Sequence, residues 1–258
     1  MCEKTYIKSA IKSAAFSLIA ALGVNLGLQP AARAIVGPSD NPQRPLSDQI
    51  VLLTNSRGSF CSGVRITSQT VLTAAHCALD GDTIKIIEID ANGKPLFIDV
   101  LSVLRHPEFS IDAYRNHRAT ADIALLRTGR SNSRSAALRL LSSGKIPVVG
   151  ERLYVAGYGV AVQGDGRSGG KLRGVYLAVT GKPGNLQIRL QDSDTKNSSP
   201  GAGACDGDSG APAFDRNGDL IGIVSWTTAA GNNTGCGGLT GITPVRRYLP
   251  WVKQVLSQ

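Results

Sequence analysis

The segment ACDGDSGAPAF, residues 204–214, places one serine, Ser209, among small residues and beside two acids, Asp206 and Asp208. The glycines around the serine allow a tight turn and leave its hydroxyl uncrowded. A serine hydroxyl is a weak nucleophile at neutral pH and needs a base whose pKa lies near the working pH, which histidine supplies. The segment therefore predicts a nucleophilic Ser209, provided that a histidine and an orienting acid can reach it.

The chain has three histidines, and their surroundings differ. His106 is interpreted as the end of a strand, and His117 lies in a polar loop. His76 lies in VLTAAHC, directly after an apolar run and beside Cys77. A disulfide at that cysteine would fix the backbone that carries the imidazole ring. His76 is therefore the candidate general base.

A catalytic histidine also needs a carboxylate that holds its tautomer and stabilises the imidazolium. Asp122, in TADIALLRT, lies at the start of an apolar run, where a carboxylate is expected to be buried and oriented. Taken by itself, Asp122 is better interpreted as an ordinary aspartate at a strand edge. The combination with His76 and Ser209 favours the orienting role.

The elements that must position these residues are short strands. Hydrophobic residues make up 42% of the chain and charged residues 18%, which is typical of a globular protein and excludes a disordered one. Short β-type runs punctuated by glycine predict strands at 49–54, 63–67, 70–75, 83–89, 97–104 and 123–128, and then at 152–159, 174–180, 185–190, 220–226 and 241–245. Without a βαβ rhythm the fold class is all-β, and residues 131–144 are a plausible crossing between two halves.

A single helix is expected at the end of the chain, over residues 247–257. Leu249, Val252, Val255 and Leu256 share one face of it, so it is expected to pack on the core. Pro250 is expected in its first turn, because proline disrupts a helix interior.

The first 34 residues differ from the rest and are interpreted as a secretory signal peptide. A lysine-containing start precedes an apolar stretch at 14–28, which is short for a membrane span, and Ala32 and Ala34 form an A-x-A cleavage site. A membrane anchor is the alternative. The expected location of the mature protein is secreted, either extracellular or periplasmic.

Removal of residues 1–34 takes Cys2 with it and leaves Cys61, Cys77, Cys205 and Cys236. An even number of cysteines in an exported chain predicts two disulfides, for which three pairings are possible. The net charge of the whole chain is +9, without a basic stripe carrying interleaved aromatic residues, so nucleic acid is not an expected partner.

Four segments, TAAHC, DIALL, GDSGAP and IVSW, follow one another in this order and resemble the motifs of the chymotrypsin-like (trypsin-fold, S1-type) serine peptidases. The resemblance runs from Ile35 to the C-terminal helix. It implies two six-stranded antiparallel β-barrels followed by that helix, a peptidase domain at 35–258 with barrels at about 35–135 and 136–258, and a catalytic cleft between them.

The resemblance also implies roles for individual residues. His76 would be the general base, Asp122 its orienting acid and Ser209 the nucleophile of an endopeptidase that forms an acyl-enzyme. The backbone N–H groups of Gly207 and Ser209 would form the oxyanion hole. Cys61 would pair with Cys77, and Cys205 with Cys236.

Asp208, in this family, turns inward and binds the α-amino group of a chain that begins Ile-Val-Gly. This sequence has Ile35-Val36-Gly37, and cleavage after Ala34 would free Ile35 directly. Cleavage after Arg33 would leave one extra residue, which displaces the amine by about 3.5 Å. The hypothesis is that export and activation are one cleavage, without a zymogen stage. Pro38 departs from the family pattern, in which a second glycine is common.

Substrate preference follows from the pocket positions that the resemblance assigns. Gly203 occupies the place of the aspartate that selects Arg or Lys, so no charge is expected at the pocket base. Ser225, Trp226 and Thr227 would form one wall, with the backbone of 225–227 pairing with the substrate. Thr240 would form the opposite wall, although a one-residue gap would place Gly241 there. Two threonines would narrow the pocket and favour small residues such as Ala, Val or Ser. Asp206 is expected on the rim.

Protein or peptide substrates and protein inhibitors are the expected partners of a monomer with no stable membrane anchor, no cofactor and no metal. The main alternative function is an inactive secreted binding protein on a peptidase scaffold. An esterase is disfavoured because the G-x-S-x-G motif at 207–211 lacks its last glycine and the order His, Asp, Ser differs from that fold. The polar segment 227–235 could also regulate access.

Overall fold

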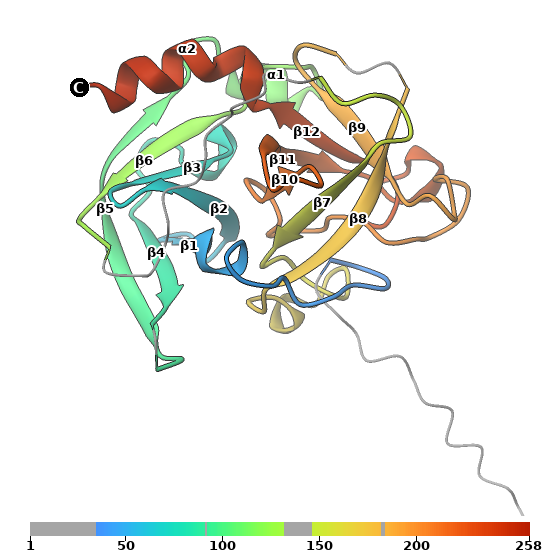
Figure 1. Cartoon of the computed structure of the whole chain (residues 1–258), viewed down its shortest axis with the longest axis horizontal. Coiled ribbons are helices and arrows are strands. Elements are labelled where there is room, and N and C mark those ends of the chain that lie inside the picture. Colours follow the sequence, from blue (N-terminus) through green and yellow to red (C-terminus); the bar gives the residue numbers. More distant parts are fainter. Residues whose placement is uncertain (1–34, 91, 132–145, 182–183) are drawn as a thin grey trace, which may run out of the picture. The chain divides into compact units, whose positions relative to one another are not determined.

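Two closed antiparallel β-barrels of six strands each form the part of the chain that the structure describes (Figure 1). The structure is a computed structural model, and it describes residues 35–131 and 146–258 without residues 91, 182 and 183. The predicted signal peptide and the predicted boundary between the barrels lie outside the described residues. The all-β, two-barrel prediction is confirmed.

The first barrel closes in the order β1-β2-β3-β6-β5-β4. Its strands are β1 (Ile50–Asn55), β2 (Phe60–Thr67), β3 (Thr70–Thr73), β4 (Ile84–Ile89), β5 (Pro95–Arg105) and β6 (Ala124–Thr128). Alternation places every second side chain inside, and in β4 Ile84 and Ile86 are buried while Lys85 between them is exposed. Val51, Leu53 and Leu126 complete this apolar interior.

The second barrel closes in the order β10-β11-β12-β9-β8-β7. Its strands are β7 (Arg152–Gly157), β8 (Arg173–Thr180), β9 (Ile188–Gln191), β10 (Pro212–Phe214), β11 (Leu220–Thr227) and β12 (Thr240–Pro244). A separate apolar cluster fills this barrel, and a third cluster joins the two barrels, in which Ile50 and Leu72 of the first pack with Tyr154 and Phe214 of the second.

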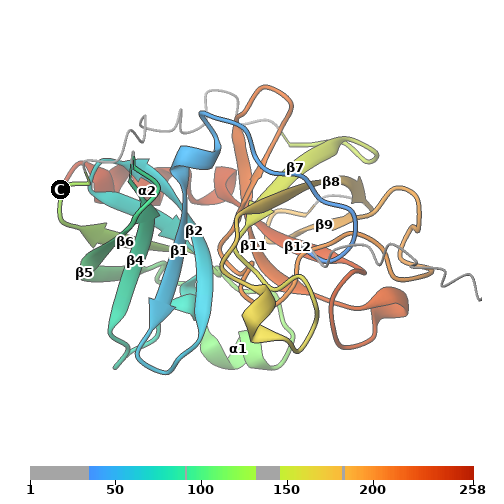
Figure 2. The same ribbon diagram turned by 90° about the horizontal axis from the view of Figure 1, so that it is seen from below.

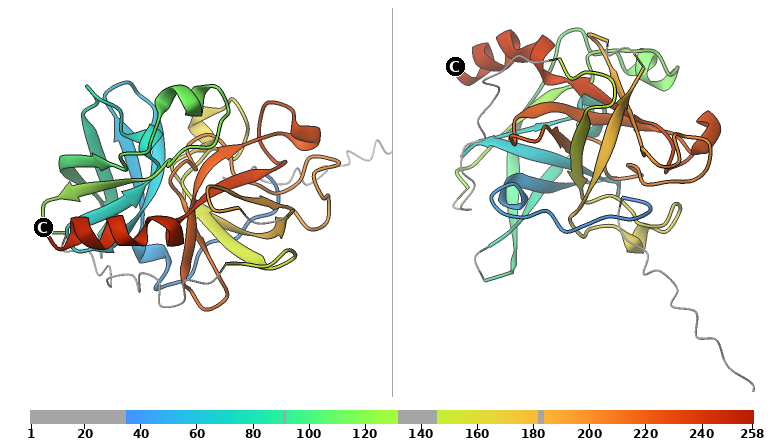
Figure 3. Two further views of the ribbon diagram at one scale, coloured as in Figure 1. Left: turned by 90° about the horizontal axis from the view of Figure 1, so that it is seen from above. Right: turned by 45° about the vertical axis from the view of Figure 1, so that its right-hand side comes forward.

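The helix α2 (Val245–Leu256) follows β12 of the second barrel directly but packs against the first barrel (Figure 3). Tyr248, Val252 and Val255 are its buried side chains, and the guanidinium of Arg127 on β6 donates a hydrogen bond to the carbonyl of Val255. The helix therefore ties the two barrels together.

Pro250 lies in the second turn of α2, so the prediction of a first-turn proline is wrong. The helix begins at Val245, two residues earlier than expected, because β12 ends directly at Pro244. Proline has no N–H to offer the carbonyl of Arg246 four residues earlier. Arg246 is exposed, so water can reach this turn of the helix.

Every predicted strand is present, but the sequence analysis missed two short elements. Strand β10 has only three residues, and helix α1 (Ile111–Arg115) lies in the connection between β5 and β6. Figure 2 shows α1 where the two barrels meet. The short helices Ser47–Gln49, Ala75–Cys77, Gly166–Ser168 and Ala230–Asn232 are of the 3-10 type. Among the described residues no helix has the length and apolarity to span a membrane.

Candidate active site

His76 makes two hydrogen bonds to one carboxylate, one through its imidazole and one through its backbone N–H. His76 lies in the 3-10 helix that follows β3, and its Nδ1 is 2.8 Å from Oδ2 of Asp122. The backbone N–H of His76 donates to Oδ1 of the same carboxylate at 3.0 Å. With Nδ1–H donated to Asp122, the lone pair of the neutral ring is on Nε2, where a general base needs it.

The carboxylate of Asp122 has a third donor, from the second barrel. Its side chain is 1% exposed, and the hydroxyl of Ser225 on β11 donates to Oδ2 at 2.6 Å. A buried carboxylate is stabilised by such hydrogen bonds, which favour its charged form. Ser225, predicted as a substrate-binding residue, therefore also orients the acid.

Tyr114 of α1 is a neighbour of the site that the sequence analysis missed. Its ring stacks on the ring of His76 with centroids 4.3 Å apart and planes 14° from parallel. Its hydroxyl donates to the carbonyl of Ser225 at 3.3 Å, and burial, together with the charge of Asp122, raises its pKa. The available signal was Ser110, whose hydroxyl caps α1 by accepting from the N–H of Ala113, a position typical of helix starts.

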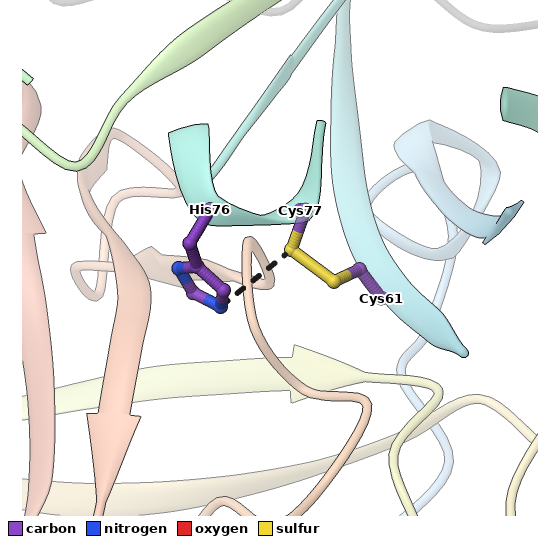
Figure 4. Close-up of side chains that lie close together, drawn as sticks. All are labelled: Cys61, His76 and Cys77. Carbon is purple, nitrogen blue, oxygen red and sulfur yellow. Dashed lines mark hydrogen bonds between the residues drawn. A yellow bond between two sulfur atoms is a disulfide. The ribbon is translucent and has the colours of Figure 1, made fainter. Parts of the chain in front are cut away.

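Ser209 is brought to His76 by contacts around the Cys61–Cys77 disulfide, which is present as predicted (Figure 4). Nε2 of His76 lies 3.8 Å from Sγ of Cys77, and the carbonyl oxygen of Ser209 lies 3.7 Å from the same sulfur. The N–H of Ser62 donates to that carbonyl at 2.8 Å. Among the described residues, the hydroxyl of Ser209 makes no hydrogen bond to His76, a bond that is often long in unliganded sites.

The turn that carries Ser209 leaves two of its N–H groups free. The N–H of Asp208 donates to Cys205 and that of Gly210 to Val224, whereas those of Gly207 and Ser209 donate to no acceptor in the described part of the chain. Gly207 has φ +90°, and a Cβ atom there would lie 2.1 Å from the ring of Phe60. Only glycine therefore fits this turn, which presents two free donors as an oxyanion hole requires.

Asp208 is fully buried next to this turn. Its carboxylate accepts hydrogen bonds from the N–H groups of Gly159 at 2.8 Å and Cys205 at 2.9 Å. Burial raises the pKa of Asp208 to about 7, although these two hydrogen bonds and the charge of Arg173 oppose the shift. Burial therefore outweighs the two hydrogen bonds and the charge of Arg173 in setting the pKa of this carboxylate.

The segment that begins at Ile35 is inserted beside the Ser209 turn. Ile35 is fully buried, and the carbonyl of Val36 accepts a hydrogen bond from the N–H of Gly203 at 3.2 Å. Val36 also packs on the Cys205–Cys236 disulfide, the second predicted bridge, which is present. Ile35 has φ +58°, which is strained for a β-branched residue.

Thr227 and Thr240 lie opposite each other on β11 and β12, and both contact Ala204. The hydroxyl of Thr227 donates to the carbonyl of Ala204 at 2.8 Å, and that of Thr240 accepts from its N–H at 3.0 Å. A Cβ atom at Gly203 would lie 3.5 Å from the hydroxyl of Thr240. Gly203 and the two threonines therefore gather around one short segment.

Gly241 pairs with Trp226 instead of with Thr227. A Cβ atom at Gly241 would lie 2.0 Å from the indole of Trp226, so the glycine makes room for that ring. Thr240 is therefore the cross-strand partner of Thr227. Asp206 is exposed, as its predicted place on the rim requires.

Comparisons with known proteins agree with this architecture. The family model described as Trypsin matches residues 35–252. Pig trypsin is 30% identical over 226 residues, covering 79% of this chain and 88% of its own, and human chymotrypsin-like elastase family member 1 is 28% identical, covering 86% and 92%.

Solved structures share the fold at lower identity. Human heparin binding protein matches with a TM-score of 0.68 at 22% identity, covering 86% of this chain and 97% of its own. Mouse neuropsin, a serine protease, matches with a TM-score of 0.68 at 22% identity, covering 86% and 100%. Because the family model spans most of the sequence and the two barrels carry its motifs, the chain belongs to the trypsin family of chymotrypsin-like serine peptidases.

Proposed function

We propose that this protein is a secreted serine endopeptidase that hydrolyses peptide bonds through Ser209, His76 and Asp122. The observation that carries the proposal is the hydrogen bond from Nδ1 of His76 to a carboxylate that is 1% exposed, because a proton held on Nδ1 leaves Nε2 as the basic atom of the ring. An isolated surface histidine would not be held in one tautomer in this way.

The proposed reaction uses groups that converge on one cleft. Nε2 of His76 removes the proton of the Ser209 hydroxyl as its oxygen attacks the substrate carbonyl. The protonated ring then gives that proton to the leaving amine, which departs and leaves an acyl-enzyme. Water, activated by His76, hydrolyses the acyl-enzyme. The free N–H groups of Gly207 and Ser209 stabilise the oxyanion at each step.

Activation is proposed to follow cleavage after Ala34. The freed ammonium of Ile35 would pair with the carboxylate of Asp208, whose pKa is raised to about 7 by burial. Cleavage would also relieve the strain at Ile35, because φ +58° exists only while a residue precedes it. The A-x-A pattern at Ala32 and Ala34 makes this the same cut as export.

The preferred cleavage site is proposed to follow a small aliphatic residue. Thr227 and Thr240 are cross-strand partners, and the hydroxyls of both are hydrogen-bonded to the backbone of Ala204. Their methyl groups would narrow the pocket, and Gly203 would leave its base uncharged. Proteins and peptides are the proposed substrates of a monomeric enzyme that protein inhibitors would also bind.

Labelling with a fluorophosphonate tests the catalytic proposal. The protein that starts at Ile35 should react with one equivalent of the reagent at Ser209, and Ser209→Ala should not react. Peptide 4-nitroanilides that end in Ala, Phe and Arg would then measure which residue the pocket prefers, and the Ala substrate should be hydrolysed fastest. Absence of labelling in folded protein would reject the proposal.

A binding protein on the same scaffold is the second candidate. One structural neighbour is named for heparin binding, and the hydroxyl of Ser209 makes no hydrogen bond to His76 among the described residues. Without residues 1–34 the chain has 24 Lys and Arg and 18 Asp and Glu, and this net charge of +6 would suit an anionic ligand. Binding to heparin by protein that is not labelled at Ser209 would favour this candidate.

A further inference from the structure

Arg173 is an arginine on the inner face of the second barrel. It begins β8 and pairs with Gly157 of β7, in the same register that pairs Val175 with Val155 and Leu177 with Leu153. The valine and leucine pairs belong to the apolar interior of the barrel or pack against it. Cross-strand partners share a face, and the face repeats every second residue, so Arg173 continues this inward series. Its exposure of 9% agrees with that direction.

Gly157 connects this arginine to the carboxylate of Asp208. A Cβ atom at Gly157 would lie 2.4 Å from Oδ1 of Asp208, so this carboxylate occupies the space that a side chain at 157 would fill. Arg173 lies directly across the strand pair from that glycine. The guanidinium of Arg173 accordingly lowers the pKa of Asp208 and opposes the effect of burial.

The charged and polar groups that face Asp208 are few. The N–H groups of Gly159 and Cys205 donate to it, the carboxylate of Asp206 raises its pKa, and Arg173 lowers it. The proposed cleavage would add the ammonium of Ile35. That ammonium loses its charge in alkaline solution, since a free α-amino group has a pKa of about 8. A guanidinium remains charged at every pH in which the protein is folded.

We propose that Arg173 is a second cation for Asp208, present in the chain before and after cleavage. It is a positioning residue: when the amine of Ile35 is blocked or deprotonated, Arg173 keeps the carboxylate of Asp208 ionised and the Ser209 turn in place. The consequence for catalysis rests on the proposed function. The proposed interaction of Arg173 with Asp208 does not rest on that function, because both groups are buried in the uncleaved chain.

The pH dependence of activity tests the proposal in the protein that starts at Ile35. Active-site titration and kcat/KM would be measured from pH 7 to 10.5 for wild type, Arg173→Met and Arg173→Lys. We expect Arg173→Met to lose at least about tenfold more activity than wild type as the amine deprotonates, which corresponds to about one pKa unit. Arg173→Lys should restore the wild-type profile until the lysine itself deprotonates.

Arg152→Met is the matched control, because Arg152 lies on the same strand pair, at the start of β7, but is exposed. Its profile should follow wild type. Superimposable alkaline limbs for wild type and Arg173→Met would overturn the proposal. If Arg173→Met does not fold, the wild-type protein with an acetylated Ile35 amine decides: retained active-site titration supports the second cation, and complete loss refutes it.

A double-mutant cycle gives a readout that needs no catalysis. Urea unfolding of wild type, Arg173→Gln, Asp208→Asn and the double variant would be measured at pH 8 and pH 4. We expect the two substitutions to be coupled at pH 8, where Asp208 is ionised, and additive at pH 4, where it is protonated. Additivity at both pH values would refute the pairing. A folded wild type that is not labelled at Ser209 would refute the proposed function instead.

Discussion

Asp122 and Asp208 are two buried carboxylates of the candidate active site, and they differ in the groups that donate hydrogen bonds to them. Asp122 is 1% exposed and accepts hydrogen bonds from the ring and backbone of His76 and from Ser225. Asp208 is 0% exposed and accepts only two backbone hydrogen bonds, so burial raises its pKa to about 7. Two equally buried carboxylates therefore have different sets of hydrogen-bond donors.

This difference indicates which part of the site already has all its stabilising partners in the uncleaved chain. In the His76–Asp122 half, the carboxylate of Asp122 accepts hydrogen bonds from a backbone N–H, from a serine hydroxyl and from an imidazole that can itself carry a proton. The Ser209 half depends on a carboxylate that needs a cation, because an unpaired buried charge is costly. We propose two cations for it, the amine of Ile35 after cleavage and the guanidinium of Arg173.

The largest expected effect is on the half that is complete. Asp122→Asn should lower kcat by about 10⁴-fold, because an amide can donate to Nδ1 and so favour the wrong tautomer of His76. Its fold should be unchanged, since the amide replaces the carboxylate with the same shape. The kinetics of a small ester or anilide substrate would measure this, and a loss below tenfold would show that Asp122 does not orient the ring.

The second prediction concerns the pH dependence of stability in the uncleaved chain. The folded pKa of Asp208, about 7, lies above the unfolded value near 3.9. The folded state therefore binds the proton more tightly, so the free energy of unfolding is highest below pH 4 and falls as pH rises towards and through 7. The loss should be on the order of 4 kcal/mol, from about three pKa units.

Urea titrations at pH 4.5 and pH 8 would measure this loss, with Asp208→Asn as the control. The control should lose less stability over the same interval, because an amide does not titrate. Protein that starts at Ile35 should also lose less, because its ammonium pairs with the carboxylate. An equal slope in all three proteins would show that Asp208 is not the group responsible.

A smaller effect is expected in the pocket of the second barrel. Thr227→Gly should raise kcat/KM for a substrate ending in Phe, relative to one ending in Ala, by roughly 10- to 100-fold, the range that a few methyl or methylene groups produce. Thr227→Ser, which keeps the hydroxyl bonded to Ala204, should lie between the two. An unchanged ratio would place the narrowing of the pocket elsewhere.

The smallest expected effect is at Ser225, which links the two halves. Ser225→Ala removes one of three donors to Asp122 and should lower kcat by about tenfold, because hydrogen bonds to charged groups contribute about 1.5–3 kcal/mol, part of which water replaces. KM should change little if the backbone of 225–227 is retained. A loss as large as that of Asp122→Asn would make Ser225 as important as the acid itself.

Most of the fold and much of the candidate site could be predicted because their signals are local. The strands are apolar or alternating runs bounded by turns, and His76, Asp122 and Ser209 lie in short motifs. β10 was missed because three residues contain too little periodicity to detect. The helix α1 was missed because five residues with one capping serine do not differ from a polar loop. Tyr114 was missed with it.

From the amino-acid sequence alone we could predict the two-barrel fold, the candidate triad and the glycines that a tight turn requires, and family resemblance predicted the pairing of the disulfides. These features depend on residues within a few positions of one another, or on motifs in a characteristic order. The three-dimensional structure was needed to show that Thr240 pairs with Thr227, that Tyr114 stacks on His76, and that Arg173 lies across the strand pair from Gly157, next to which the carboxylate of Asp208 lies. Strand register and barrel closure bring those residues together, and register depends on the pairing of strands that are distant in sequence.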